Sequence, residues 1–207
     1  MFDELNGKQT SNLADVVRHR GETYTYSPRF LYRMVAPGET TPGRLERLRR
    51  PSESLWALNS HPRGLLVGTA SGLLNVAGET AEFILRDEAS TVGIGWHPDD
   101  PDTILSGSLQ GLNELHWDGA QWLSSGVITG TESEIRTIAF ESLRAAWLGT
   151  TTREFVRIER PDAPDSRWRD AKITHYYGTR GLPANLGWSH VVAVPVGIAF
   201  LTAKGVY

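Results

Sequence analysis

The chain of 207 residues contains no cysteine. Disulfide bonds and cysteine-ligated metals are therefore excluded, although this absence alone does not fix the compartment. The chain also lacks an excess of charge of one sign, because acidic and basic residues are interspersed and the formal net charge is −3. Without a basic stripe we expect no nucleic-acid partner.

Long hydrophobic runs are missing as well. The longest apolar stretches, such as 191–201, contain proline and glycine and fall far short of the roughly 20 residues of a membrane-spanning helix. Residues 1–8 lack the basic start and the apolar stretch of a signal peptide. We therefore expect no membrane span in this chain. The lack of a signal peptide indicates a cytoplasmic protein, a mature or cloned fragment, or an internal piece of a longer chain.

Apolar residues at helical spacing are rare, whereas the chain has 21 glycines, 11 prolines and 7 tryptophans. This composition favours short strands and many turns. The predicted fold class is all-β.

A hairpin pattern recurs along the chain. Residues 65–76 form two short apolar runs around a Gly-Thr-Ala-Ser-Gly turn. The same shape recurs at 23–34, 104–115, 147–158 and 199–207. One residue precedes the Ser or Thr of each turn, and these residues are Tyr26, Gly68, Gly107, Gly149 and Leu201. They are separated by 42, 39, 42 and 52 residues. Propeller blades repeat at about 40–45 residues.

Each repeat has the same internal order: an apolar strand, a polar turn, the hairpin, and a more polar last strand. The first strands are expected at 13–17, 55–59, 92–96, 135–140 and 190–194, and the last at 45–48, 81–85, 121–124 and 173–177. This order predicts a β-propeller of four-stranded blades, with inner strands buried on both faces and outer strands half solvated.

We interpret residues 1–207 as a single β-propeller domain or fragment with about five blades. The expected units are 6–48, 49–85, 86–128, 129–177 and 178–207, with 1–5 as an outer strand. Either strands from both termini close a five-bladed ring, or the chain is an excerpt of a larger ring. We favour the excerpt, because Tyr207 falls where a third strand should begin. The proline- and aspartate-rich segment 160–172 is expected to be a lengthened surface loop.

Three segments resemble the two-component regulator propeller repeat: Ile-Arg-Thr-Ile-Ala-Phe at 135–140, Ala-Trp-Leu-Gly-Thr at 146–150, and Gly-Thr-Arg-Gly-Leu-Pro-Ala-Asn at 178–185. The resemblance implies a sensor module of a bacterial membrane-bound signalling protein. Its location would be periplasmic or extracytoplasmic, ahead of a signalling domain that this chain lacks. The chain departs from the family pattern at Arg153-Glu154, where Gly-Leu is usual, and at Leu201, which replaces glycine.

Catalytic and metal sites are not expected. No Gly-x-Ser-x-Gly motif is present, so we predict no enzyme, no catalytic residues and no cofactor. None of the six histidines has metal-ligand spacing. His19, His61 and His97 occupy the same turn of successive repeats, which turn chemistry explains better than coordination.

The hairpin turns and the longest blade-to-blade connection carry the candidate ligand-binding residues. The turns supply Arg29, Ser71, Gln110, Arg153 and Lys204, and the connection supplies Arg180, Asn185 and Trp188. We expect Trp56, Trp96 and Trp147 instead to pack between blades. Four cations favour an anionic or polyhydroxylated ligand, although the same residues are also compatible with plain solvated turns.

The predicted function is a non-catalytic sensor or binding domain for an unknown small molecule, a glycan or a protein partner. The alternative is a free-standing structural propeller that scaffolds protein–protein interactions. A third interpretation is a propeller-type hydrolase.

Overall fold

The computed structural model describes residues 4–5, 8–9, 14–38, 42–48, 53–78, 80–87, 89–152, 154–163, 165–178, 182 and 186–207. The chain is all-β and consists of five antiparallel blades of a β-propeller, which confirms the predicted fold class. It divides into two compact units, residues 1–88 and 89–207. The described residues contain no helix with the length and apolarity needed to cross a membrane.

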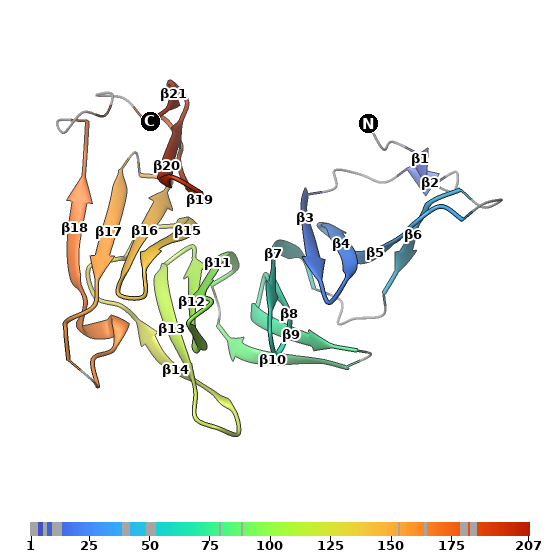
Figure 1. The fold of residues 1–207 in the computed structure, drawn as a ribbon, viewed down its shortest axis with the longest axis horizontal. Helices are drawn as coiled ribbons and strands as arrows, with labels where there is room; N and C mark the ends of the chain where they lie inside the picture. Colours follow the sequence, from blue (N-terminus) through green and yellow to red (C-terminus); the bar gives the residue numbers. More distant parts are fainter. Residues whose placement is uncertain are drawn as a thin grey trace. The chain divides into compact units, whose positions relative to one another are not determined.

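The first unit contains two four-stranded blades and a short hairpin (Figure 1). Blade 1 runs in the order β3 (Ala14–His19), β4 (Glu22–Ser27), β5 (Phe30–Val35) and β6 (Arg44–Arg47). Blade 2 consists of β7 (Leu55–His61), β8 (Gly64–Thr69), β9 (Gly72–Ala77) and β10 (Thr80–Arg86). Every residue of β8 is buried, as expected for an inner strand that is covered on both faces.

Near the N-terminus, β1 (Glu4–Leu5) pairs with β2 (Lys8–Gln9) in a two-stranded hairpin. The assignment of residues 1–5 as an outer strand stays a prediction. The single-domain interpretation and its repeat boundaries stay predictions.

The second unit contains blades 3, 4 and 5. Blade 3 consists of β11 (Thr91–His97), β12 (Asp100–Ser108), β13 (Gly111–Trp117) and β14 (Trp122–Val127). Blade 4 consists of β15 (Ile135–Ser142), β16 (Ala145–Thr150), β17 (Phe155–Glu159) and β18 (Lys172–Tyr176). Blade 5 has the three strands β19 (Ser189–Val194), β20 (Gly197–Thr202) and β21 (Gly205–Val206).

The glycine that precedes the hairpin turn in blades 3 and 4 has a packing role. A Cβ added to Gly107 would collide with the carbonyl oxygen of Ile135, where blade 4 begins. A Cβ on Gly149 would collide in the same way with the carbonyl oxygen of Ser189, where blade 5 begins. Glycine at this position therefore lets the first strand of the next blade pack directly on the hairpin.

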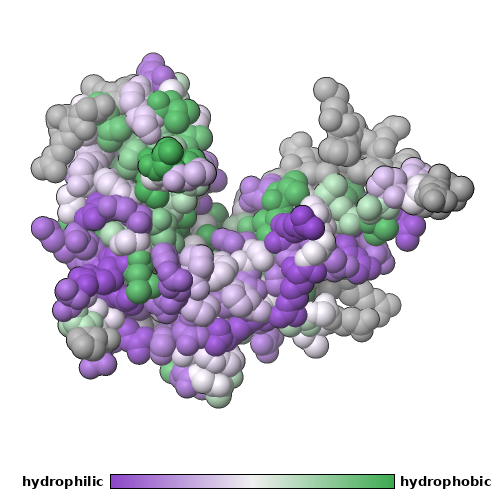
Figure 2. All heavy atoms as spheres, in the orientation of Figure 1, coloured by the Kyte–Doolittle hydropathy of each residue, from purple (hydrophilic) through white to green (hydrophobic). Residues whose placement is uncertain are grey.

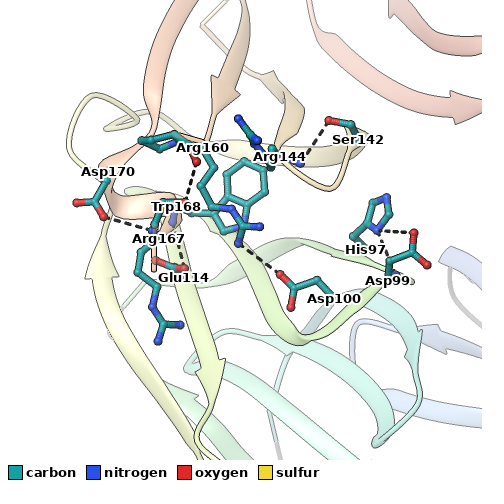
Figure 3. A network of polar contacts seen from close by, with 12 residues as sticks. His97, Asp99, Asp100, Glu114, Ser142, Arg144, Arg160, Arg167, Trp168 and Asp170 are labelled. Carbon is teal, nitrogen blue, oxygen red and sulfur yellow. Dashed lines mark hydrogen bonds and ion pairs between the residues drawn. The ribbon is translucent and has the colours of Figure 1, made fainter. Parts of the chain in front are cut away.

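Segment 160–172 is not the plain surface loop that we expected. It contains a short 3-10 helix, η1 (Trp168–Asp170), whose Trp168 is only 1% exposed and belongs to the core of blades 3 and 4. The carboxylate of Glu114, on β13, accepts the backbone N–H groups of Trp168 (3.2 Å) and Arg169 (3.3 Å) (Figure 3). The segment is long because it inserts an anchor into the core.

The other tryptophans divide as follows. Trp147 packs against Tyr176 and Phe200, with ring centroids 4.8 and 4.7 Å away, so it fills the junction of blades 4 and 5 as predicted. Trp56, in contrast, is 47% exposed, and the prediction that it is a packing residue is wrong. It lies on β7 between the buried residues Leu55 and Ala57, and side chains next to each other on a strand point to opposite faces.

Candidate functional site

The candidate site is built on the hairpin turns of the second unit. The turns β12–β13, β16–β17 and β20–β21 join equivalent strands, so they lie at the same end of their blades. The last residue before each turn, Ser108, Thr150 or Thr202, is buried and donates its hydroxyl to a backbone carbonyl beyond the turn, at 2.9–3.2 Å. We call this contact the hydroxyl clamp. The same oxygen accepts a backbone N–H from within the turn, so the loop conformation is fixed from inside.

Two of the predicted site residues project from clamped turns of this unit. Gln110 and Lys204 are exposed, and their backbone N–H groups donate to Ser108 (3.1 Å) and Thr202 (3.0 Å). Within the described part of the chain, neither side chain makes a hydrogen bond or an ion pair. Both side chains are thus held at a defined place by their backbone and are available to solvent.

Trp188 lies at the same end, immediately before β19. It is 50% exposed, and its ring contacts His190 edge to face at 5.2 Å. Blade 5 also exposes several aliphatic side chains, and apolar atoms lie among polar ones over β19–β21 (Figure 2). The exposed aliphatic residues are Val192, Val194, Val196 and Val206.

In the first unit, Arg29 is exposed in the β4–β5 turn. Ser71 lies in the β8–β9 turn, where its hydroxyl donates to Glu53 at 3.0 Å, so it already has a structural partner. The clamp of that turn is Thr69, which donates to the carbonyl of Gly72 at 3.0 Å. The other three predicted residues, Arg153, Arg180 and Asn185, lie outside the described residues.

A polar cluster that was not predicted from the sequence lies beside the β16–β17 turn. Glu154 is only 7% exposed, and its carboxylate accepts the hydroxyl of Thr152 (3.1 Å) and lies 2.9 Å from Nδ1 of His175. A further hydrogen bond to Glu154 raises the pKa of Tyr177, whose ring stacks on His175 with an interplanar angle of 12°. The available signal was Glu154 itself, where the family pattern has leucine.

This cluster fixes the orientation of His175, because the carboxylate of Glu154 accepts the Nδ1 proton. The side chain of His175 is 37% exposed. The cluster therefore presents Nε2, the second polar atom of the ring, beside an aromatic face.

The histidines at the repeated turn act in the turn itself. Nδ1 of His61 accepts the backbone N–H of Arg63, and Nδ1 of His97 accepts that of Asp99, both at 3.1 Å. His19 bonds instead to the hydroxyl of Ser60 at 3.0 Å. Among the described residues, no three His, Asp or Glu side chains come together as a metal site would require.

Comparison with known proteins gives the fold a context. No protein-family model matches the chain, and no curated protein matches it. Among solved structures, the chain is similar to the extracellular domain of a putative hybrid two-component system from B. thetaiotaomicron, with a TM-score of 0.72 and 11% identity. That match covers 98% of this chain and 27% of the other protein, so the chain spans about a quarter of its length.

Two further structures are similar at the level of the fold. One is the β-propeller domain of Cps50 (Swd1) from Myceliophteria thermophila, with a TM-score of 0.64, 16% identity, and coverage of 97% of this chain and 69% of that one. The other is a virginiamycin B lyase from Staphylococcus aureus, with a TM-score of 0.59, 13% identity, and coverage of 93% and 67%.

These similarities establish a β-propeller and leave the activity to be argued from the site. The set includes the extracellular domain of a signalling system and an enzyme, and one propeller fold hosts unrelated functions. The hydroxyl clamps, the exposed turn side chains and the Glu154 cluster are accordingly the features on which a function must rest.

Proposed function

We propose that this chain is a non-catalytic sensor propeller of a bacterial signal-transduction protein, located outside the cytoplasm. The hairpin-turn end of blades 3 to 5 binds the ligand or partner. The observation that carries the proposal is the pair of exposed polar side chains, Gln110 and Lys204, held on clamped turns at the same end as Trp188. Rigid scaffolds that display variable loop residues are the usual way in which repeat folds recognise partners.

Two further lines support this function. The repeat resembles the two-component regulator propeller family at 135–140, 146–150 and 178–185. The fold is similar to an extracellular domain of a putative two-component system. The proposed binding set extends to Arg153, Arg180 and Asn185, and to Arg29 and Ser71 of the first unit.

A ligand screen tests the proposal directly. Thermal unfolding of the full chain is followed with glycans and organic acids at about 100 times their dissociation constants. Binding to the folded state then adds about 2.7 kcal/mol, which corresponds to about 5–10 °C for a chain of this size. We expect Lys204→Ala and Trp188→Ala to reduce the shift caused by an active compound.

The matched control is Val196→Ala. Val196 is 96% exposed in the β19–β20 turn, at the opposite end of the same blade. An active compound should stabilise this variant as it does the original chain. An equal loss of the shift in Val196→Ala and Lys204→Ala would contradict the proposed face.

The signalling context has its own test. The gene sequence on both sides of residues 1–207 should encode a membrane span and a kinase or other output domain. If it encodes neither, the alternative of a free-standing scaffold for protein partners replaces the sensor.

A further inference from the structure

The first unit contains a cavity that the proposed function does not use. It lies between blades 1 and 2, has a volume of about 740 Å³, and falls within the usual range of small-molecule pockets. Residues from β3 to β6 line one side, and residues from β8 and β9 line the other. The lining includes Arg20, Arg33, Arg47, Leu48, Leu65 and Val76.

The junction of these two blades is built differently from the junctions of the second unit. Blade 1 has Tyr26 at the position that is Gly107 in blade 3 and Gly149 in blade 4. The phenol of Tyr26 is buried, and its hydroxyl donates to the carbonyl of Trp56 on blade 2 at 2.6 Å. A ring thus takes the position where glycine allows a direct backbone approach in the second unit. The cavity is lined by other residues of the same two blades.

One wall of the cavity is a polar network of one arginine and two glutamates, with a formal net charge of −1. The guanidinium of Arg33 contacts Glu22 and Glu46, each at 2.7 Å. The hydroxyl of Tyr24 donates to Glu22 at 2.6 Å. These groups hold one another in place, so they shape the wall more than they attract a ligand.

Two other arginines of the lining carry uncompensated charge. Arg20 donates to the backbone carbonyl of Pro62 at 2.9 Å, and the guanidinium of Arg47 lies 4.8 Å from the ring centre of Phe30. Within the described residues neither forms an ion pair. Burial, and then the charge of Arg20, lower the pKa of His19, so this ring is neutral at pH 7. Counted over the described residues, the lining has three arginines against two glutamates, an excess of one positive charge.

The lining also has an apolar part. Val76 on β9 and Leu48, which follows β6, are partly exposed, whereas Leu65, the cross-strand partner of Val76, is buried in the core of these blades. A ligand in the cavity would therefore meet hydrocarbon from both blades beside the guanidinium groups.

We propose that this cavity binds a small amphiphilic carboxylate, a monocarboxylic acid with a hydrocarbon or aromatic body. Its carboxylate is held by Arg20 and Arg47, whose planar guanidinium groups match a carboxylate. Its body packs on Leu48 and Val76. A monoanion balances the single excess charge of the lining, whereas a dianion would overcompensate it.

Calorimetric titration of the full chain tests the assignment. The probes are octanoate and 3-phenylpropanoate, with 3-phenylpropan-1-ol and 3-phenylpropylamine as uncharged and cationic analogues. We expect saturable binding of the two carboxylates and at least tenfold weaker binding of the alcohol and the amine. Equal binding of the alcohol and the acid, or no binding of either acid up to millimolar concentration, would overturn the proposal.

Variants locate the site. Arg20→Gln and Arg47→Gln should each weaken octanoate binding at least tenfold, because both change exposed side chains at the cavity and remove the charge. Arg86→Gln is the matched control, since Arg86 is exposed on β10 of the same unit and does not line the cavity. Val76→Thr, which keeps the size of the side chain, should weaken octanoate binding. A loss in Arg86→Gln as large as that in Arg47→Gln would refute the site.

The proposal for the hairpin-turn end and the proposal for the cavity can be tested separately. Lys204→Ala lies in the second unit and should leave octanoate binding unchanged. If Lys204→Ala abolishes octanoate binding while Arg47→Gln does not, the carboxylate binds at the hairpin-turn end and the cavity assignment is wrong.

Discussion

At the scale of single residues, a glycine can be required for packing and not for its backbone conformation. Gly149 is the clearest example, because the chain needs no unusual backbone angle there. What it needs is the absence of a Cβ, since the first strand of blade 5 passes directly over the residue. The glycine of the repeat is therefore a contact residue between blades.

Gly149→Ala should lower the free energy of unfolding by about 1–3 kcal/mol, the usual cost of overpacking a tight contact. The added methyl group would overlap the carbonyl of Ser189 and the hydroxyl of Thr137. Urea denaturation measures the change. Gly78→Asn is the control, because Gly78 has a φ of +61°, which asparagine tolerates, and no neighbour within 4 Å of an added Cβ. Equal effects of the two variants would contradict the packing role.

His19 makes stability depend on pH. Burial is the main cause that lowers its pKa below the ordinary value of 6.5, and the charge of Arg20 adds to it. As the pH falls below about 6.5, the unfolded chain binds the proton first. The stabilisation by the neutral ring is therefore fully present above that pH and is lost as the pH falls toward the folded-state value.

We expect the original chain to lose more stability between pH 7.5 and pH 5.5 than His19→Gln does. Urea denaturation of both chains at the two pH values gives this difference, in which the other titrating groups cancel. His190, whose pKa is lowered by burial and by Arg136, should behave in the same way in His190→Gln. Identical pH dependence in the original chain and in both variants would contradict the assignment.

At the scale of elements, the positions of the strands could be predicted from the sequence, whereas contacts between residues far apart in the chain could not. The expected strand at 55–59 is β7 (Leu55–His61), and that at 173–177 is β18 (Lys172–Tyr176). Alternation and turn residues are local signals, so they find strands to within about two residues. The anchor at Trp168 depends on Glu114, which lies 54 residues earlier. No local pattern in a proline-rich segment indicates such a partner.

The candidate site shows the same division. Gln110 and Lys204 were found because turn residues are recognisable in sequence. The Glu154 cluster was missed because it forms through the pairing of β17 with β18, in which Val156 faces His175. That register brings Glu154 and Tyr177 to the same strand ends, and periodicity alone does not specify it.

Trp168→Ala should cost about 3–5 kcal/mol, as expected for removing a large buried ring. Glu114→Gln should cost about 1–3 kcal/mol, because an amide group cannot accept both backbone N–H groups. Asp162→Asn is the control in the same segment, since its side chain is 86% exposed and its ion pair with Arg144 lies on the surface. Chemical denaturation ranks the three, and a cost for Asp162→Asn as large as that for Glu114→Gln would contradict the anchor.

At the scale of the whole molecule, the chain consists of two compact units, and each contains a hydrophobic cluster of its own among the described residues. In repeat folds, stability is close to a sum of local terms and contacts between neighbours. A defect in one core should therefore affect mainly the blades that share that core.

Hydrogen exchange followed by mass spectrometry tests this division. Trp168→Ala should increase amide exchange in β12 to β18, while exchange in β7 to β9 stays close to that of the original chain. The physical reason is that Trp168 contacts only the core of blades 3 and 4 among the described hydrophobic clusters. Equal loss of protection in both units would show one cooperative fold instead.

The hydroxyl clamp has a consequence for how such a protein evolves. Because Ser108, Thr150 and Thr202 fix their turns through contacts that face inward, the loop conformation does not depend on the side chains at positions such as 110 and 204. Substitutions at these positions should therefore change the stability of the fold little. A lineage could thus exchange one recognised compound for another while the blades beneath stay unchanged.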